Sequence, residues 1–285
     1  MQAAMQRGTF GHAPGEWTDD TQLATCIADA HSDPARTAAS ILDWFRGKPL
    51  DVGVSTSRLL SQVKRPDLMA GMSRKLGIQA ASHPRPAGWD PGMANGSLMR
   101  TGPACLPYLG NRDKIAESAR ELSDLTHYDP DGWTGDACVI WSLAIASYID
   151  DSSLNASDLG RVLMEALDSI PEERQVSWFD LVAEALTGLG ETPKRNGSAV
   201  AAFKCALRAV AHASSLADGL QRAVAMGDDT DTVAAIAGAL LGAIHGASAV
   251  PPEWRSALHG WTPRGLMYAG DLGNLALEAA GVQVS

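Results

Sequence analysis

The chain has 285 residues, of which 45% are apolar and 20% charged, proportions typical of a soluble globular protein that can bury a substantial core. Its 23 basic and 33 acidic residues give a formal net charge of −10. This charge argues against a nucleic-acid backbone or an anionic membrane as the main partner, because both bind basic surfaces.

Helical patterns dominate from the first apolar segment onward. Apolar residues recur three and four positions apart, as on one face of a helix, in five segments: 20–30, 37–45, 137–149, 159–167 and 200–213. Turn-rich joints such as RGKPLD, HPRPAGWDPGMANG, HYDPDGWTG, TPKRNGS and VPPEW separate helical segments, and no series of alternating strand-like segments is present. The sequence therefore predicts a single all-α domain over residues 1–285, with many helices around an Ala- and Gly-rich centre.

The longest uncharged segment, residues 232–252, approaches the roughly 20 residues that a membrane-spanning helix needs. It consists mostly of Ala and Gly and contains His245, so it would insert only weakly into a bilayer. Gly238, Gly242 and Gly246 recur every four residues and would give a smooth face to which a neighbour can pack closely. We expect a buried helix of a soluble protein here, and no membrane partner.

Cysteine usage and the N-terminus both point to a cytoplasmic protein. The four cysteines lie far apart without a CxxC pair, which fits neither a disulfide framework nor a zinc site; they are Cys26, Cys105, Cys138 and Cys205. The first 17 residues contain no apolar stretch of the signal-peptide type. We expect reduced, mostly buried thiols.

Two short segments rich in Asp and Thr each precede an apolar helical pattern: GEWTDDT (residues 15–21) and GDDTDT (residues 227–232). Helix capping explains part of this composition, since Thr18 and either Asp229 or Thr230 suit the N-cap and acids suit the positive end of a helix dipole. Capping readily uses one acid per helix. It does not explain the same crowded pattern twice.

Carboxylates and hydroxyls are hard oxygen ligands, which suit Mg²⁺ or Mn²⁺ better than zinc. If the fold brings the two segments together, their oxygens could hold two ions about 3.5–4 Å apart. Bound cations would then offset the repulsion between the crowded acids.

Two other motifs match the second segment in part. An EF-hand loop starting at Asp229 would need Gly and Glu where the chain has Ala234 and Leu240. Residues 229–233 (DTDTV) also fit the DxDx(T/V) nucleophile motif of haloacid-dehalogenase-like phosphatases. That motif follows an apolar strand early in a Rossmann-like fold, whereas here it follows a helical pattern late in the chain.

Four segments, in family order, resemble the ADP-ribosylglycohydrolase family, which includes dinitrogenase-reductase-activating glycohydrolase. GEWTDDTQLA and GDDTDTVAAIAGALLGAIHG are similar to its two signature stretches, NGSLMR (residues 95–100) to its NGxxMR motif, and LTHYDP (residues 125–130) to its TH-containing segment. The resemblance implies an all-α fold, a two-metal centre, and cleavage of the bond between ribose C1″ of ADP-ribose and a modified side chain.

Carried over position by position, the resemblance implies two sets of metal ligands: Thr18, Asp19, Asp20, Asp229, Asp231 and Thr232. Asp19, Asp20 and Asp231 are the implied catalytic residues, and Asp231 is shared between the ions. Glycosidic cleavage passes through an oxocarbenium-like state. Two Mg²⁺ or Mn²⁺ ions could orient the ribose hydroxyls and lower the pKa of a bound water, and an Asp of the cluster could accept its proton.

The NGSLMR segment has two interpretations. It could be a turn that starts a helix with Ser97 as its cap, or backbone N–H groups near Asn95, Gly96 and Ser97 could hold a diphosphate. His127 of the TH-containing segment is either a core histidine or a further ligand-binding residue. Arg100 could pair with an internal acid as easily as with phosphate, so we assign it no ligand role.

One part of the family pattern has no counterpart here. Family members usually begin with a helix that carries a GDALG-like stretch and an acidic metal ligand or acid/base, but only 17 residues precede Thr18. Their sole acid, Glu16, lies inside the motif itself, so that role is not transferred to it. We expect a hydrolase for an ADP-ribosylated protein or small molecule, weakened if it works without that helix. A relative that only binds ADP-ribose is the alternative, and the phosphatase comes third.

Overall fold

Helices form almost the whole architecture. The computed structural model describes residues 6–83 and 91–283, so part of the joint predicted before Asn95 lies outside the described residues. The α-helices are α1 (Asp19–Asp29), α2 (Pro34–Arg46), α3 (Val54–Leu60), α4 (Met69–Ala81), α5 (Arg112–His127), α6 (Trp133–Asp150), α7 (Leu159–Leu167), α8 (Glu172–Thr187), α9 (Ala199–Ala211), α10 (Leu216–Ala225), α11 (Thr230–His245), α12 (Pro252–Ala257) and α13 (Ala269–Ala279). The 3₁₀ helices are η1 (Pro66–Leu68), η2 (Asn95–Arg100), η3 (Gly102–Tyr108), η4 (Ala156–Asp158) and η5 (Ala247–Ala249), and the strands are β1 (His259–Thr262) and β2 (Gly265–Tyr268).

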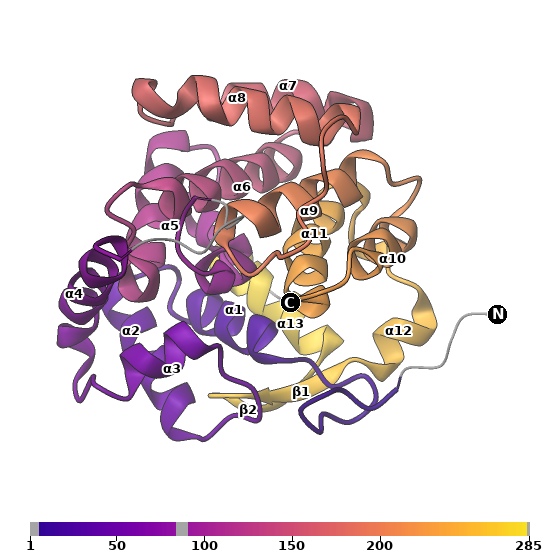
Figure 1. Cartoon of the computed structure of the whole chain (residues 1–285). Helices are drawn as coiled ribbons and strands as arrows, with labels where there is room; N and C mark the ends of the chain where they lie inside the picture. The colour runs from indigo at the N-terminus through magenta and orange to yellow at the C-terminus, as the bar shows by residue number, and fades with distance from the viewer. Residues whose placement is uncertain (1–5, 84–90, 284–285) are drawn as a thin grey trace.

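The five predicted helical segments correspond to α1, α2, α6, α7 and α9, which confirms the all-α prediction. Helices α7 and α8 lie along one edge of the molecule, and the β1–β2 hairpin lies at the opposite edge (Figure 1). Helices α6, α9 and α11 lie between these edges and contact one another.

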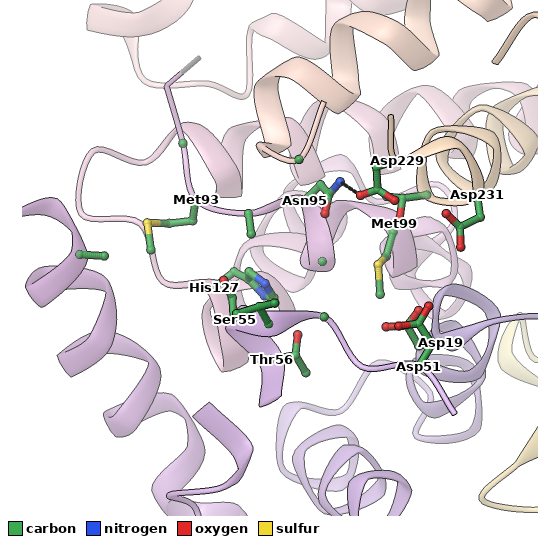
Figure 2. A pocket seen from close by; sticks show the side chains of 18 of the residues that line it. Asp19, Asp51, Ser55, Thr56, Met93, Asn95, Met99, His127, Asp229 and Asp231 are labelled. Atoms are coloured by element: carbon green, nitrogen blue, oxygen red, sulfur yellow. Dashed lines mark hydrogen bonds between the residues drawn. The ribbon is translucent and has the colours of Figure 1, made fainter. Parts of the chain in front are cut away.

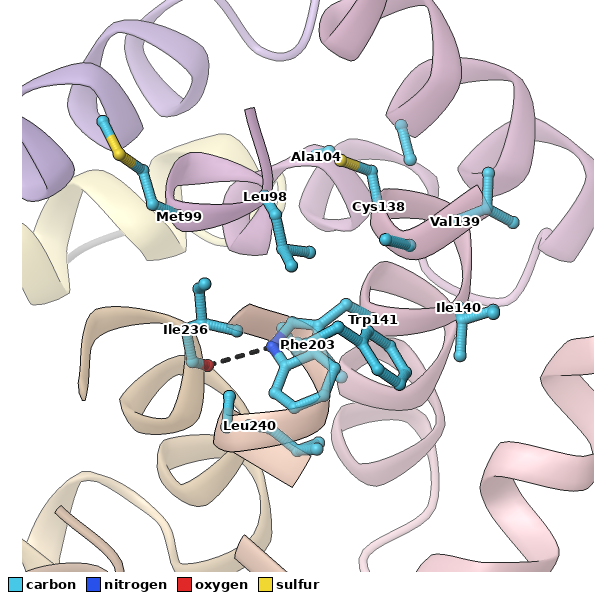
Figure 3. Packing of buried hydrophobic residues seen from close by; sticks show 14 of the residues in the cluster. Leu98, Met99, Ala104, Cys138, Val139, Ile140, Trp141, Phe203, Ile236 and Leu240 are labelled. Atoms are coloured by element: carbon cyan, nitrogen blue, oxygen red, sulfur yellow. Dashed lines mark hydrogen bonds between the residues drawn. The ribbon is translucent and has the colours of Figure 1, made fainter. Parts of the chain in front are cut away.

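Helix α6 crosses the core. Its side chains are apolar or small around nearly the whole circumference, which is typical of a helix buried on all sides. Trp141 Nε1 donates to the Ile236 carbonyl of α11 at 3.0 Å, so the one polar atom of this side chain is paired (Figure 3). The same ring meets Phe203 of α9 edge-on at 5.1 Å between centroids. These contacts hold α11, whose first turn carries the second acidic segment, against the centre of the protein.

The glycines of α11 do not mark its closest contact, contrary to the sequence-based expectation. A Cβ at Gly242 would have no atom within 4 Å, and one at Gly238 would meet only Leu220 Cδ2 at 3.3 Å. The close approach lies on α10, where a Cβ at Gly219 would lie 2.6 Å from Leu241 Cδ1. Among the described helices, none is long and apolar enough to cross a membrane.

All four cysteines are buried thiols, as predicted. Burial raises the pKa of the Cys26 thiol to about 11 and that of Cys105 to about 12. These thiols therefore stay protonated at neutral pH, where they pack as small apolar groups.

The β1–β2 hairpin is an element of a type that the sequence analysis did not predict. Its strands pair antiparallel from His259 opposite Tyr268 to Thr262 opposite Gly265. Each strand is only four residues long, too short for an alternating pattern to stand out. Gly265 adopts φ +110° after the turn, a conformation that favours glycine.

Candidate functional site

A cavity of about 530 Å³ opens where α1, α3, α11 and η2 begin and α4 ends. Four carboxylates lie at one end of it, and Met93 and His127 lie toward the other (Figure 2). We call these four residues the acidic cluster: Asp19, Asp51, Asp229 and Asp231. The described residues that line the cavity include no Lys or Arg, so no ammonium or guanidinium group among them offsets the negative charge.

Most of the predicted site residues meet in this cavity. Its lining includes Asp19, Asn95, Gly96, His127, Asp229, Asp231 and Thr232. Asp20 instead lines a neighbouring cavity of about 340 Å³, which shares Met99 with the first. Thr18 and Ser97 line neither cavity, and the buried Ser97 hydroxyl accepts a hydrogen bond from Ser123 at 3.0 Å.

The hairpin positions the start of α1. The Trp17 backbone N–H donates to the His259 carbonyl at 3.0 Å, and its indole N–H donates to the Trp261 carbonyl at 3.3 Å. Gly260 lies against this indole so closely that a Cβ there would collide with the ring. The start of α1, which follows Trp17, is therefore held in place by strands that lie near the other end of the sequence.

Neither acidic segment caps its helix through a side chain. Thr18 and Asp229 occupy the N-cap positions of α1 and α11, but neither accepts a cap hydrogen bond. Thr18 Oγ1 donates to Asp20 Oδ2 at 2.7 Å, and Asp229 Oδ2 accepts from Asn95 Nδ2 at 2.7 Å. Other helices of the protein do use the N-cap side chain in this way: Asp33, Asn111, Ser198 and Ser215. Capping therefore does not account for the acidic segments.

Asn196, which the sequence analysis did not single out, holds the turn before α11. Its buried side chain donates to the Gly227 carbonyl and accepts from the Asp229 N–H, both at 2.9 Å. Its own backbone N–H donates to Asp228 Oδ2 at 2.9 Å. The Asp228 carboxylate is thus directed at Asn196 and is not part of the cavity lining, although it adjoins Asp229 in sequence. As one Asn in a turn-rich joint, Asn196 gave no local signal.

We expect Asn196→Ala to lower the free energy of unfolding by about 1–3 kcal/mol, because it leaves a buried polar group of this turn unpaired. Chemical denaturation measures the loss. Asn274→Ala on the exposed side of α13 is the matched control and should change stability by less than about 0.5 kcal/mol. Equal stability of the two variants would contradict this role of Asn196.

The buried surroundings of the acidic cluster, and of Asp20 beside it, disfavour ionised carboxylates that have no cation nearby. Burial, and then the Asp51 carboxylate, raise the pKa of Asp19 to about 7. Burial and Asp19 raise the pKa of Asp20 well above its usual range. Asp20 Oδ1 is buried and has no hydrogen-bond partner among the described residues. A cation would satisfy this oxygen and relieve the repulsion.

Asp51 is the second site residue that the sequence analysis missed. It ends the RGKPLD joint, where a single Asp looks like an ordinary turn residue. Burial and the Asp231 carboxylate raise its pKa, and His12 lowers it. Only the folded chain shows that it faces the same cavity as both acidic segments.

The donor atoms of the two segments fit a hard divalent cation, since all are carboxylate or hydroxyl oxygens. In the described ranges, however, no group of three or more His, Cys, Asp and Glu side chains is already arranged to hold a metal ion. The ligand set therefore remains a prediction that rests on donor chemistry and on the unpaired negative charge.

The profile of the ADP-ribosylglycohydrolase family matches residues 1–283. The chain belongs to the ADP-ribosylglycohydrolase family. It is 29% identical over 262 residues to the ADP-ribosylarginine hydrolase Tri1 of Pseudomonas putida (strain GB-1), covering 87% of this chain and 63% of that protein. It is 27% identical over 199 residues to the Homo sapiens ADP-ribosylhydrolase ARH3, covering 59% and 54% respectively. The chain thus spans less than two thirds of the length of these two relatives.

A solved structure described as an ADP-ribosylglycohydrolase-related protein complex is similar in fold to this member of the ADP-ribosylglycohydrolase family. The TM-score is 0.68 at 26% identity, over 97% of this chain and 85% of the solved chain. The fold excludes the phosphatase interpretation, because residues 229–233 follow helix α10 and begin α11, and the sheet of the described residues is a two-stranded hairpin. Glu16 lies outside the cavity lining and accepts a hydrogen bond from the Ala13 N–H at 2.7 Å.

Proposed function

We propose that this chain hydrolyses the glycosidic bond between ADP-ribose and a modified side chain, using two Mg²⁺ or Mn²⁺ ions. The proposed ligands are Thr18, Asp19, Asp20, Asp229, Asp231 and Thr232. The observation that carries the proposal is the acidic cluster at one end of a 530 Å³ cavity whose described lining has no Lys or Arg. The names of the relatives support the ADP-ribosyl substrate class. A cytoplasmic location is part of the same proposal.

Different side chains of the cavity have different proposed roles in the reaction. When bound, the two ions would polarise a water molecule and orient ribose hydroxyls. Asp51 lines the same end of the cavity but is outside the proposed ligand set, so its carboxylate can accept a proton from the attacking water. Its raised pKa brings it closer to neutral pH, where a general base works best. Asn95 holds Asp229 in place through its side-chain amide.

The diphosphate of the substrate would lie farther along the cavity, beside Gly96 and His127. The Asn95 N–H donates to the Gly197 carbonyl at 3.0 Å, so this amide is already paired. Ser97 contributes no side chain to the lining. A larger residue would not fit at position 96 without moving the His127 ring, because a Cβ there would lie 2.9 Å from both Cε1 and Nε2 of His127.

We expect Gly96→Ala to weaken ADP-ribose binding by about tenfold, or 1.4 kcal/mol, because the added methyl group displaces the His127 ring. Gly96→Val should weaken it further. Calorimetry with ADP-ribose measures the change. Gly71→Ala in α4 is the control, since its Cβ meets no atom within 4 Å and should leave affinity unchanged. Unchanged affinity in Gly96→Ala would remove Gly96 and His127 from the ligand site.

The proposed function is tested by incubating the purified chain with ADP-ribosyl-arginine and Mg²⁺ or Mn²⁺ and measuring free ADP-ribose. Release that EDTA abolishes supports the proposal, and a parallel incubation with ADP-ribosyl-serine compares the two linkages. Binding of ADP-ribose without release from either substrate would favour the alternative, a relative that only binds the ligand.

A further inference from the structure

Arg100 is a buried cation with no carboxylate partner among the described residues. Its guanidinium donates to the Gly96 carbonyl at 3.1 Å, the Leu122 carbonyl at 3.2 Å and Thr126 Oγ1 at 2.7 Å. Burial lowers its pKa to about 10, which still leaves it protonated at neutral pH. Because a guanidinium has donors only, Thr126 Oγ1 must be the acceptor in the third of these hydrogen bonds.

This fixes the direction of the next hydrogen bond. Thr126 Oγ1 lies 2.7 Å from His127 Nδ1, and a hydroxyl has a single hydrogen to donate. Nδ1 is the acceptor available to that hydrogen among the described partners of Thr126. If Nδ1 carried a proton instead, the buried Thr126 hydroxyl would be left without an acceptor. Nδ1 is therefore unprotonated, and the neutral ring carries its hydrogen on Nε2.

The Nε2 edge of the ring faces the cavity. His127 is among the lining residues, and its Nε2 lies beside Gly96, with no hydrogen-bond partner in the described ranges. Figure 2 shows the ring near Ser55 and Thr56 of α3, which contribute hydroxyls and no charge. Burial, and then Arg100 from η2, lower the pKa of His127 to about 3, and no other charged group contributes to this shift. The ring is thus neutral throughout the physiological range.

We propose that Arg100 and Thr126 are positioning residues that hold His127 as the Nε2–H tautomer, and so make it a hydrogen-bond donor to a phosphate oxygen of ADP-ribose. The identity of the ligand rests on the proposed function, whereas the tautomer rests on the hydrogen-bond chain alone. In this tautomer Nε2–H can donate a hydrogen bond to an oxyanion. It has no lone pair with which to accept a hydrogen bond from an N–H or ammonium group.

Nuclear magnetic resonance of the full chain labelled with ¹⁵N-histidine tests the tautomer directly. The signals of His127 are those missing from the His127→Gln variant. We expect a protonated Nε2 and an unprotonated Nδ1, unchanged between pH 5.5 and pH 8. A protonated Nδ1, or an imidazolium ring within that range, would overturn the proposal whatever the protein catalyses.

Thr126→Val tests the relay, because it keeps the side-chain shape but removes the hydroxyl, and Thr126→Ser restores it. We expect the valine variant to lose the single Nε2–H signature and to bind ADP-ribose about tenfold more weakly, as for a lost hydrogen bond to a charged group. The serine variant should match the wild type in both measurements. A wild-type signature in a folded Thr126→Val would show that Thr126 does not position the ring.

If the Thr126→Val variant does not fold, the spectra of the wild type and of Thr126→Ser still decide the tautomer. If the wild type shows the tautomer but no affinity for ADP-ribose, the proposed function and the ligand assignment fail while the relay stands.

Discussion

Asp231→Asn is expected to lower turnover of an ADP-ribosyl substrate by about 10²–10⁴-fold, because losing this proposed metal ligand also removes the activated water from which Asp51 would accept a proton. Asp231 lines the acidic end of the cavity from the first turn of α11, and its charge raises the pKa of Asp19 and of Asp51. The family resemblance implies that Asp231 is a ligand shared by both ions, so the amide would weaken the binding of both. Initial rates at saturating Mg²⁺ or Mn²⁺ provide the measurement.

The chain offers a matched control within the same turn. Asp228→Asn removes the same charge three residues earlier, but Asp228 is not in the cavity lining and an amide oxygen can still accept from the Asn196 N–H. Its turnover should stay close to that of the wild type. Full turnover by Asp231→Asn, or an equal loss of turnover in both variants, would contradict the two-metal mechanism.

Divalent cations are expected to raise the melting temperature, and EDTA should reverse the gain. At a hundredfold excess over Kd, a ligand that binds only the folded state stabilises it by about 2.7 kcal/mol. For a protein of this size that corresponds to a rise of roughly 5–10 °C. Thermal unfolding with and without Mg²⁺ or Mn²⁺ checks this.

The pH dependence follows from Asp19. Its pKa is raised from 3.8 to about 7, so between these values the folded state holds a proton that the unfolded chain has released. The stability of the metal-free protein should therefore fall as pH rises from 4 through about 7, and cations should stabilise more at pH 8 than at pH 5.5, because they displace protons.

Two variants distinguish the contribution of Asp19 to the pH dependence and to cation stabilisation from the general effect of removing one negative charge. Asp19→Asn should reduce both the gain from cations and the fall in metal-free stability up to pH 7. Asp43→Asn in α2 removes an exposed acid, paired with Arg46 at 3.2 Å, and should leave both unchanged. If Asp19→Asn keeps the full gain from cations, Asp19 is not part of the metal site.

Features that repeat over short distances could be predicted from the amino-acid sequence. Helical spacing of apolar residues depends only on 3.6 residues per turn, so α1, α2, α6, α7 and α9 could be predicted without knowing their neighbours. The adjacent acids at residues 19–20 and 228–231 were also visible locally, because neighbouring carboxylates repel each other in any fold.

Which acids meet in the cavity, and which residues hold them there, became visible only in the folded structure. Asp51 joins the cavity from a loop with no pattern of its own, and Asn95 reaches Asp229 across 134 residues of sequence. Asp228 looks equivalent to its neighbours in sequence, yet Asn196 holds its carboxylate outside the cavity lining. The hairpin fixes Trp17 from more than 240 residues away. Such contacts depend on how helices pack, and packing depends on side-chain shape across the whole core, which no local spacing of residues encodes.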